Sequence, residues 1–154
     1  ITNSGLNNLR ELQYLEELSL GWCRNISDDG MKILASQPMR SDNLKILRIA
    51  RCQISDEGIE SVGKLKNLQG LNLNGCANVS SAALGSTLQR LPKLEVLDAS
   101  YCPGILRSSW QGKIPNLRVL ELCYSGARDS HLSYLTALPM LEELNLDSCP
   151  VGDW

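Results

Sequence analysis

The chain has 154 residues, with 15 basic and 17 acidic side chains, and 43% of its residues are hydrophobic. This size and composition are typical of one globular domain. The near-neutral charge and the lack of a dense Lys/Arg run argue against nucleic acid as a partner. No stretch approaches the roughly 20 apolar residues of a membrane span, and the N-terminus lacks the basic and apolar regions of a signal peptide. We therefore expect no membrane partner.

From the N-terminus onward, the pattern L-x-x-L-x-L-x-x-C recurs along the chain. Its six copies begin at Leu15, Leu44, Leu68, Leu94, Leu117 and Leu141, which are 23 to 29 residues apart. Ala99 replaces the third leucine of the fourth copy, and Ser125 takes the cysteine position of the fifth. Self-similarity at such a period is the signature of a solenoid, in which each unit packs only on its neighbours.

Each copy continues with an apolar residue that is followed five positions later by another, as from Ile26 to Met31. The apolar spacing then becomes three to four residues, as in Met31 and Leu34, which is helical periodicity. We therefore predict that every unit consists of a strand, a turn, a helix and a return loop.

Serine and acidic residues mark the expected helix starts, as in Ser27–Asp28 and Ser55–Asp56. A serine hydroxyl there can cap free backbone N–H groups, and a carboxylate is favoured at the positive end of the helix dipole. We interpret these acids as caps rather than metal ligands, because no EF-hand spacing is present. The fourth unit, from Ile105 to Trp110, lacks an acidic cap, so we expect its helix to be distorted.

A single unit has no second layer to cover its leucines, so the units have to stack. Stacking places parallel strands about 4.8 Å apart on a concave inner curve, with the helices on the convex side. The predicted fold is an α/β solenoid, bent as a right-handed horseshoe arc, with one domain over residues 1–154 and about six repeats. Because the chain opens in a helical tail and stops where another helix is due, we expect a fragment of a longer array.

The fuller unit L-x-x-L-x-L-x-x-C-x-x-I-S-D-x-G, seen from Leu15 to Met31 and again from Leu44 to Ile59 with one residue fewer, resembles the cysteine-containing class of leucine-rich repeat. That class is similar in architecture to the ribonuclease-inhibitor horseshoe. It is common in F-box proteins, whose repeats hold substrates for a ubiquitin ligase. The resemblance implies a protein-binding role, and a ligase adaptor bound through regions outside this chain.

Five of the six cysteines share one repeat position, namely Cys23, Cys52, Cys76, Cys102 and Cys149. No C-x-x-C pair is present, so a zinc site is not expected. We expect free thiols buried as small apolar groups, with each S–H a weak donor to nearby backbone, because stacked side chains point in parallel rather than at one another. Free thiols predict a reducing, intracellular compartment, either cytoplasmic or nuclear.

The sequence offers little for catalysis. His131 is the single histidine, and it stands at the start of a predicted outer-face helix, where no cleft would hold it against a nucleophile. We interpret it as a solvated or capping residue. The glycines do not form a phosphate-binding loop, and no cofactor or metal is expected. The chain is therefore predicted not to be an enzyme.

The residues between the consensus leucines should point to the concave inner face of the sheet, where they are not needed to fill the core. Amphipathic aromatic residues are enriched at interface hot spots, and they recur there in the column before the cysteine. At these inner-face positions, acidic residues are the prevailing charged type in the C-terminal half of the chain. Arg48 and Arg51 form a basic spot in the second copy. The predicted protein-binding residues are Trp22, Arg48, Arg51, Asp98, Tyr101, Glu121, Tyr124 and Asp147.

These residues favour a module that binds a protein or peptide ligand on its concave face. Within that class, the substrate-recognition repeats of an F-box-type ubiquitin-ligase receptor are the reading that the resemblance implies. Two alternatives remain open: a structural scaffold repeat in a larger assembly, or a regulatory sensing array attached to a catalytic domain elsewhere in the parent chain.

Overall fold

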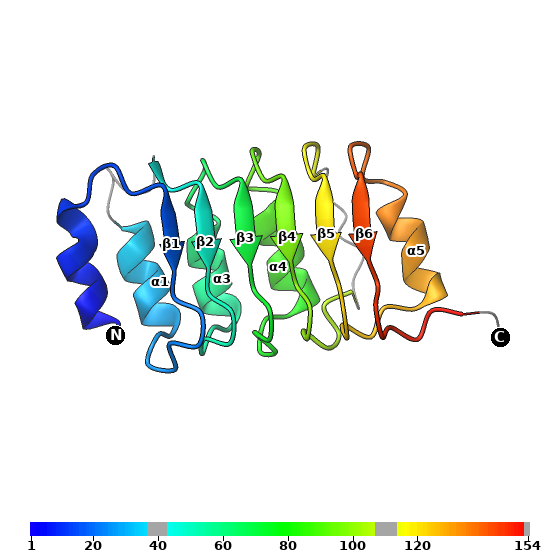
Figure 1. Ribbon diagram of the computed structural model, residues 1–154, viewed down its shortest axis with the longest axis horizontal. Coiled ribbons are helices and arrows are strands. Elements are labelled where there is room, and N and C mark those ends of the chain that lie inside the picture. Colours follow the sequence, from blue (N-terminus) through cyan, green and yellow to red (C-terminus); the bar gives the residue numbers. More distant parts are fainter. Residues whose placement is uncertain (37–42, 107–113, 153–154) are drawn as a thin grey trace.

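The computed structural model describes residues 1–36, 43–106 and 114–152. Strands and helices alternate along the chain, and Figure 1 shows the strands side by side with the helices on one side of them. The elements are the 3-10 helix η1 (Ser4–Glu11), β1 (Glu17–Ser19), α1 (Asp28–Ala35), β2 (Ile46–Arg48), α3 (Asp56–Val62), β3 (Gly70–Asn72), α4 (Ser81–Leu88), β4 (Val96–Asp98), β5 (Val119–Glu121), α5 (Asp129–Leu135) and β6 (Glu143–Asn145).

The strands form one parallel sheet in the order β1-β2-β3-β4-β5-β6, so every strand lies beside its neighbours in sequence. The pairing register is constant, because each strand aligns the same consensus position, as in Leu47 beside Leu71 and Leu71 beside Leu97. This sheet with helices packed on one side confirms the predicted leucine-rich repeat solenoid. We call the side of the sheet turned away from the helices the inner face.

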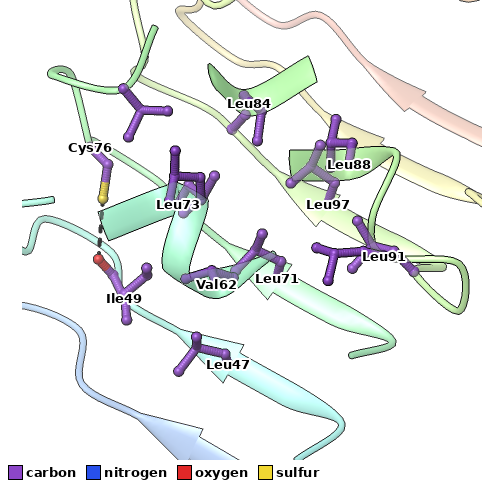
Figure 2. Close-up of a cluster of buried hydrophobic side chains, with 14 of the residues drawn as sticks. Leu47, Ile49, Val62, Leu71, Leu73, Cys76, Leu84, Leu88, Leu91 and Leu97 are labelled. Carbon is purple, nitrogen blue, oxygen red and sulfur yellow. Dashed lines mark hydrogen bonds between the residues drawn. The ribbon is translucent and has the colours of Figure 1, made fainter. Parts of the chain in front are cut away.

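The core lies between the sheet and the helices. Leu71 and Leu97 from the strands meet Val62 of α3 and Leu84 and Leu88 of α4 in one cluster (Figure 2). All five side chains are at most 2% exposed. Leu144 of β6, which pairs only with β5, is 41% exposed. A consensus leucine is therefore fully covered only when a repeat packs on each side of it.

The serine and aspartate pairs join neighbouring repeats. Ser27 and Ser55 occupy the N-cap positions of α1 and α3, but neither side chain makes a capping hydrogen bond. The backbone N–H and the hydroxyl of Ser55 both donate to the Asp28 carboxylate, at 2.8 and 2.6 Å. Ser80 binds Asp56 of the preceding repeat in the same way. The expected capping role was therefore wrong for Ser27 and Ser55. Ser80 does cap α4, because its hydroxyl oxygen accepts a hydrogen bond from the backbone N–H of Ala83 at 3.2 Å.

The glycine of the same motif makes room for this contact between repeats. A Cβ atom at Gly58 would overlap Asp28 Oδ1 of the preceding unit. At Gly30 it would lie 2.6 Å from Oδ1 of Asn3, which accepts from the backbone N–H of Ser27. The Ser-Asp-x-Gly signature is thus a clamp between stacked units. The segment from Arg107 to Trp110, where a distorted helix was expected, lies outside the described residues.

Candidate protein-binding face

One column of the inner face has an unusual backbone conformation. The residue before each cysteine position has a positive φ in all six repeats, between 53° and 72°. Five of these residues are not glycine, and they are Trp22, Arg51, Tyr101, Tyr124 and Ser148. This left-handed conformation costs roughly 1–2 kcal/mol for a residue with a side chain. Glycine and asparagine adopt this conformation most readily, so large residues in such a position are unusual.

Hydrogen bonds between repeats hold this strained column in place. The backbone N–H of Tyr101 donates to the carbonyl of Cys123 at 2.8 Å, and that of Tyr124 donates to the carbonyl of Asp147 at 3.0 Å. Trp22 makes the equivalent bond to Ala50. Because the backbone is fixed by the neighbouring repeat, the side chains project from the end of the sheet in a regular row.

Four side chains of this row form what we call the aromatic ladder: Trp22, Arg51, Tyr101 and Tyr124. The Arg51 guanidinium lies 4.8 Å from the centre of the Trp22 ring and 5.5 Å from that of Tyr101. It reaches Tyr101 by passing over Gly75, where a Cβ atom would lie 2.8 Å from Arg51 Cγ. Gly75 thus leaves the gap that a cation fills between two aromatic rings.

The ladder ends in a pair of stacked tyrosines. The rings of Tyr101 and Tyr124 lie 4.8 Å apart with an angle of 14° between their planes. Both remain exposed, Tyr101 at 42% and Tyr124 at 53%, and Trp22 is 64% exposed. Part of each aromatic surface is therefore available to another molecule.

Acidic side chains gather beside these tyrosines in an open cavity of about 600 Å³, which we call the acidic cavity. Its lining includes Asp98, Glu121 and Asp147 together with Tyr101 and Tyr124. Asp98 is held in place by Asn72 Nδ2 at 2.8 Å and by the backbone N–H of Ser100 at 3.0 Å. Within residues 1–36, 43–106 and 114–152, no ion pair involves these three carboxylates. Asp147 is exposed, and Asp98 and Glu121 are half-buried.

A second hollow, of about 360 Å³, lies over the middle of the sheet. Gly70 of β3 stands in register between Ile46 of β2 and Val96 of β4, so one side chain is missing between two apolar neighbours. Asp98 lines this Gly70 hollow as well as the acidic cavity. Sequence reasoning missed the hollow, although a glycine among large residues at an inner-face position was the signal for it.

The structure places the eight predicted binding residues on the inner face in separate groups. Five line the acidic cavity, and Trp22 and Arg51 belong to the aromatic ladder. Arg48 lines the Gly70 hollow and lies 3.2 Å from Glu17 Oε2. Arg48 and Arg51, expected to act as one basic spot, therefore have different partners. That these residues bind a protein stays a prediction.

The cysteine thiols point the other way, into the stack. Cys76 Sγ lies 3.3 Å from the carbonyl oxygen of Ile49 in the preceding repeat (Figure 2), and Cys52 and Cys102 make the same bond one repeat earlier and later. Burial raises the pKa of Cys76 to about 12 and those of Cys52 and Cys102 to about 11. These thiols are protonated donors within the core, as expected, and chemically unreactive at neutral pH.

Cys123, outside the repeat position, has a different setting. It lines the acidic cavity, and its Sγ lies 4.0 Å from Glu121 Oε2.

His131 caps α5, because its Nδ1 accepts a hydrogen bond from the backbone N–H of Arg128 at 2.9 Å. Among the described residues no group of three or more His, Cys, Asp or Glu side chains is placed to hold a metal ion. None of the helices described up to residue 152 is long and apolar enough to cross a membrane.

Comparison with known proteins agrees with this architecture. A family model described as Leucine Rich repeat matches residues 11–35, 40–63 and 137–153. The chain is a leucine-rich repeat protein. Its repeats are of the cysteine-containing class, as in F-box/LRR-repeat proteins, and it is 32% identical, over an alignment of 122 positions, to a putative F-box/LRR-repeat protein 23 of Arabidopsis thaliana. That match covers 71% of this chain and 27% of the relative, so the chain spans about a quarter of the relative's length.

Solved structures with the same fold come from unrelated settings. An internalin of Listeria monocytogenes superposes with a TM-score of 0.63 and 18% identity, over 94% of this chain and 45% of that one. A chain from the yeast complex of Rad7 and Elc1 has a TM-score of 0.59 and 20% identity, over 97% and 50% of the two chains. These similarities establish the repeat fold, which is typically used for protein interaction rather than for catalysis.

Proposed function

We propose that this chain binds a protein partner on its inner face, through a segment that presents basic residues. The observation that carries the proposal is the acidic cavity, where three carboxylates without a cationic partner among the described residues lie beside two exposed, stacked tyrosines. Aromatic residues in the centre of a patch and complementary charge around them are the features of protein interfaces.

The aromatic ladder supports a basic ligand by its own internal contact. Arg51 already places a guanidinium between Trp22 and Tyr101. The outer edge of Tyr124 and the adjacent Glu121 and Asp147 offer an incoming arginine or lysine a similar ring together with negative charge. An arginine from the partner would extend the row of stacked groups and would find its counter-ions in the cavity.

Within this class, we propose that the repeats recognise substrates for a ubiquitin ligase. The support is the similarity to a relative named as an F-box/LRR-repeat protein. Contact with a ligase adaptor would involve parts of the parent protein other than these repeats. Intracellular location, cytoplasmic or nuclear, belongs to the same proposal and agrees with the buried, protonated thiols of the repeat position.

Affinity capture with the full-length parent tests both levels of the proposal. The variant Glu121→Gln/Asp147→Asn removes two negative charges from the acidic cavity and keeps the shape of the side chains. The control Asp29→Asn/Glu60→Gln makes the same change in net charge on the helix side. Quantitative mass spectrometry should find a partner lost from the cavity variant and retained by the control.

The outcomes separate clearly. A partner that both variants retain would contradict binding at the acidic cavity. A partner lost from the cavity variant and accompanied by a ligase adaptor, which stays bound in both variants, would support the receptor role. A cavity-dependent partner without any ligase component would leave the interaction module in place and contradict the ligase assignment.

A further inference from the structure

The row of inner-face residues that crosses the sheet at the first position of each strand has a gap in its middle. The constant register aligns Ile46, Gly70, Val96 and Val119 across β2 to β5. Gly70 is the position without a side chain, and its neighbours on both sides are branched and apolar. Val96 is 42% exposed, whereas Leu71 beneath the hollow is 2% exposed. The gap therefore has apolar side chains on both sides along the row and a closed floor, and polar residues such as Arg48 and Asn72 complete its lining.

The Gly70 hollow lies beside the acidic cavity, and Asp98 lines both. Gly70 is at the first position of β3 and Glu121 is at the third position of β5, so their separation combines two strand spacings with a two-residue offset along the strands, about 12 Å in all. An extended peptide advances about 3.3 Å per residue and turns every second side chain to the same face, so four residues cover this distance with both side chains facing the sheet. A segment lying obliquely across the strands would thus reach both places with side chains four positions apart.

We propose that the partner is recognised at two points, by an apolar side chain seated in the Gly70 hollow and a lysine or arginine, four residues away, in the acidic cavity. This inference rests on the proposed function and adds the pattern that the ligand must carry. Charge complementarity argues for the basic residue, because Asp98, Glu121 and Asp147 lie together. The missing side chain at Gly70 argues for the apolar residue.

Gly70 offers a substitution that fills the hollow with little risk to the fold. Its φ is not positive, and an added Cβ atom would meet Ile46 at an ordinary 3.6 Å. Valine also suits a strand better than glycine does. Gly70→Val should therefore fold like the parent, and Gly70→Ala provides a smaller change at the same site. Ser19→Val, on exposed β1 of the same face, is the matched control.

The test selects binders for the full chain from a random peptide library, and then measures the dissociation constant of one enriched synthetic peptide. We expect enriched sequences to carry an apolar residue four positions from a lysine or arginine. Gly70→Val should weaken this peptide roughly tenfold to a hundredfold, which is the effect of losing one buried aliphatic side chain. Ser19→Val should bind it like the parent.

A second comparison assigns the apolar residue to the hollow. Replacing that residue of the peptide by alanine should weaken binding to the parent chain, but should have little further effect on Gly70→Val, because the contact is already lost. Equal effects on both proteins, or an unchanged affinity of Gly70→Val, would overturn the inference. If the inference is overturned in this way but Glu121→Gln/Asp147→Asn still loses the peptide, the proposed binding at the acidic cavity would remain supported. If no peptide is enriched, or if enriched peptides tolerate both variants, the proposed function fails as well.

Discussion

The cysteine position of the repeat and the position before it lie in the same turn, but the first is buried and the second is exposed. Cys102 is 2% exposed, and its thiol donates to the Leu73 carbonyl of the preceding repeat. Tyr101, one residue earlier, is 42% exposed and has a φ of 56°. The cysteine column holds the stack together with nearly one residue type, whereas the column before it varies among six repeats and tolerates backbone strain. A buried position that joins repeats and an exposed, variable position are thus adjacent in one turn.

The contrast teaches how such a repeat can change its ligand without changing its fold. The strained column is held by backbone hydrogen bonds to the next repeat, which do not depend on the side chain. Tryptophan, arginine, glycine, tyrosine and serine all occupy it in this chain. Variation at these positions therefore alters the inner face and leaves the leucine core intact.

The largest effect should come from the core. Leu97→Ala removes a fully buried side chain from the centre of β4 and should lower the free energy of unfolding by about 2–5 kcal/mol. Val96→Ala is the matched change on the opposite face, where the side chain is 42% exposed, and it should cost less than about 1 kcal/mol. Urea denaturation followed by circular dichroism measures both. Equal losses would contradict the division between core and inner face.

The cysteine column should make the protein sensitive to alkali. Burial raises the pKa of Cys76 from 9.0 to about 12, so the folded chain keeps a proton that the unfolded chain releases above pH 9. The contribution of this thiol to stability is therefore complete below pH 9 and is lost as the pH rises towards 12. Cys52 and Cys102, with pKa values of about 11, act in the same direction, and together the three thiols cost a few kcal/mol by pH 10.

Urea denaturation at pH 7, 9 and 10 measures this dependence. Cys76→Ala removes one titrating group, so its stability should fall less steeply between pH 9 and 10 than that of the parent chain. All other ionisable groups are the same in both proteins, so their contributions cancel in the difference. Identical slopes would show that the Cys76 thiol does not sit protonated in the core.

Much of the fold could be predicted from the sequence because the repeat reports each core position six times. Leu47, Leu71 and Leu97 recur at one place in the unit, and the structure aligns them in register. The repeat pattern does not show which side chains of neighbouring repeats bind each other. Asp28 was interpreted as a cap because its own helix offered the nearest partners, yet it binds Ser55 one repeat later.

The candidate site shows the same limit. Alternation along the strands was enough to place Glu121, Tyr124 and Asp147 on one face, and the structure puts them in one cavity. The stacking of Arg51 on Tyr101 could not be predicted, since it depends on the missing side chain of Gly75 in the repeat between them. Contacts between side chains of different repeats could not be predicted, because they depend on how the units are aligned with one another.

The clamp between repeats should have an intermediate effect. Asp28→Ala leaves the half-buried N–H and hydroxyl of Ser55 without their acceptor and should lower the free energy of unfolding by about 1–3 kcal/mol. Asp29→Ala changes the adjacent acid, whose side chain is 74% exposed beside Lys32, and should cost less than about 0.5 kcal/mol. Thermal unfolding compares the two. A larger loss in Asp29→Ala would mean that the helix dipole, and not the contact between repeats, explains the acids.

The smallest effect on stability should come from the aromatic ladder. Tyr124→Asn loses the stacking with Tyr101, worth about 0.5–1.5 kcal/mol, but relieves a left-handed backbone that asparagine adopts readily. The two changes offset each other, so urea denaturation should place the variant within about 1 kcal/mol of the parent chain. A loss above about 2 kcal/mol would instead make Tyr124 part of the structural stack. A nearly neutral result combined with weaker partner capture would mean that this strained tyrosine serves recognition, at a position that costs the fold little to vary.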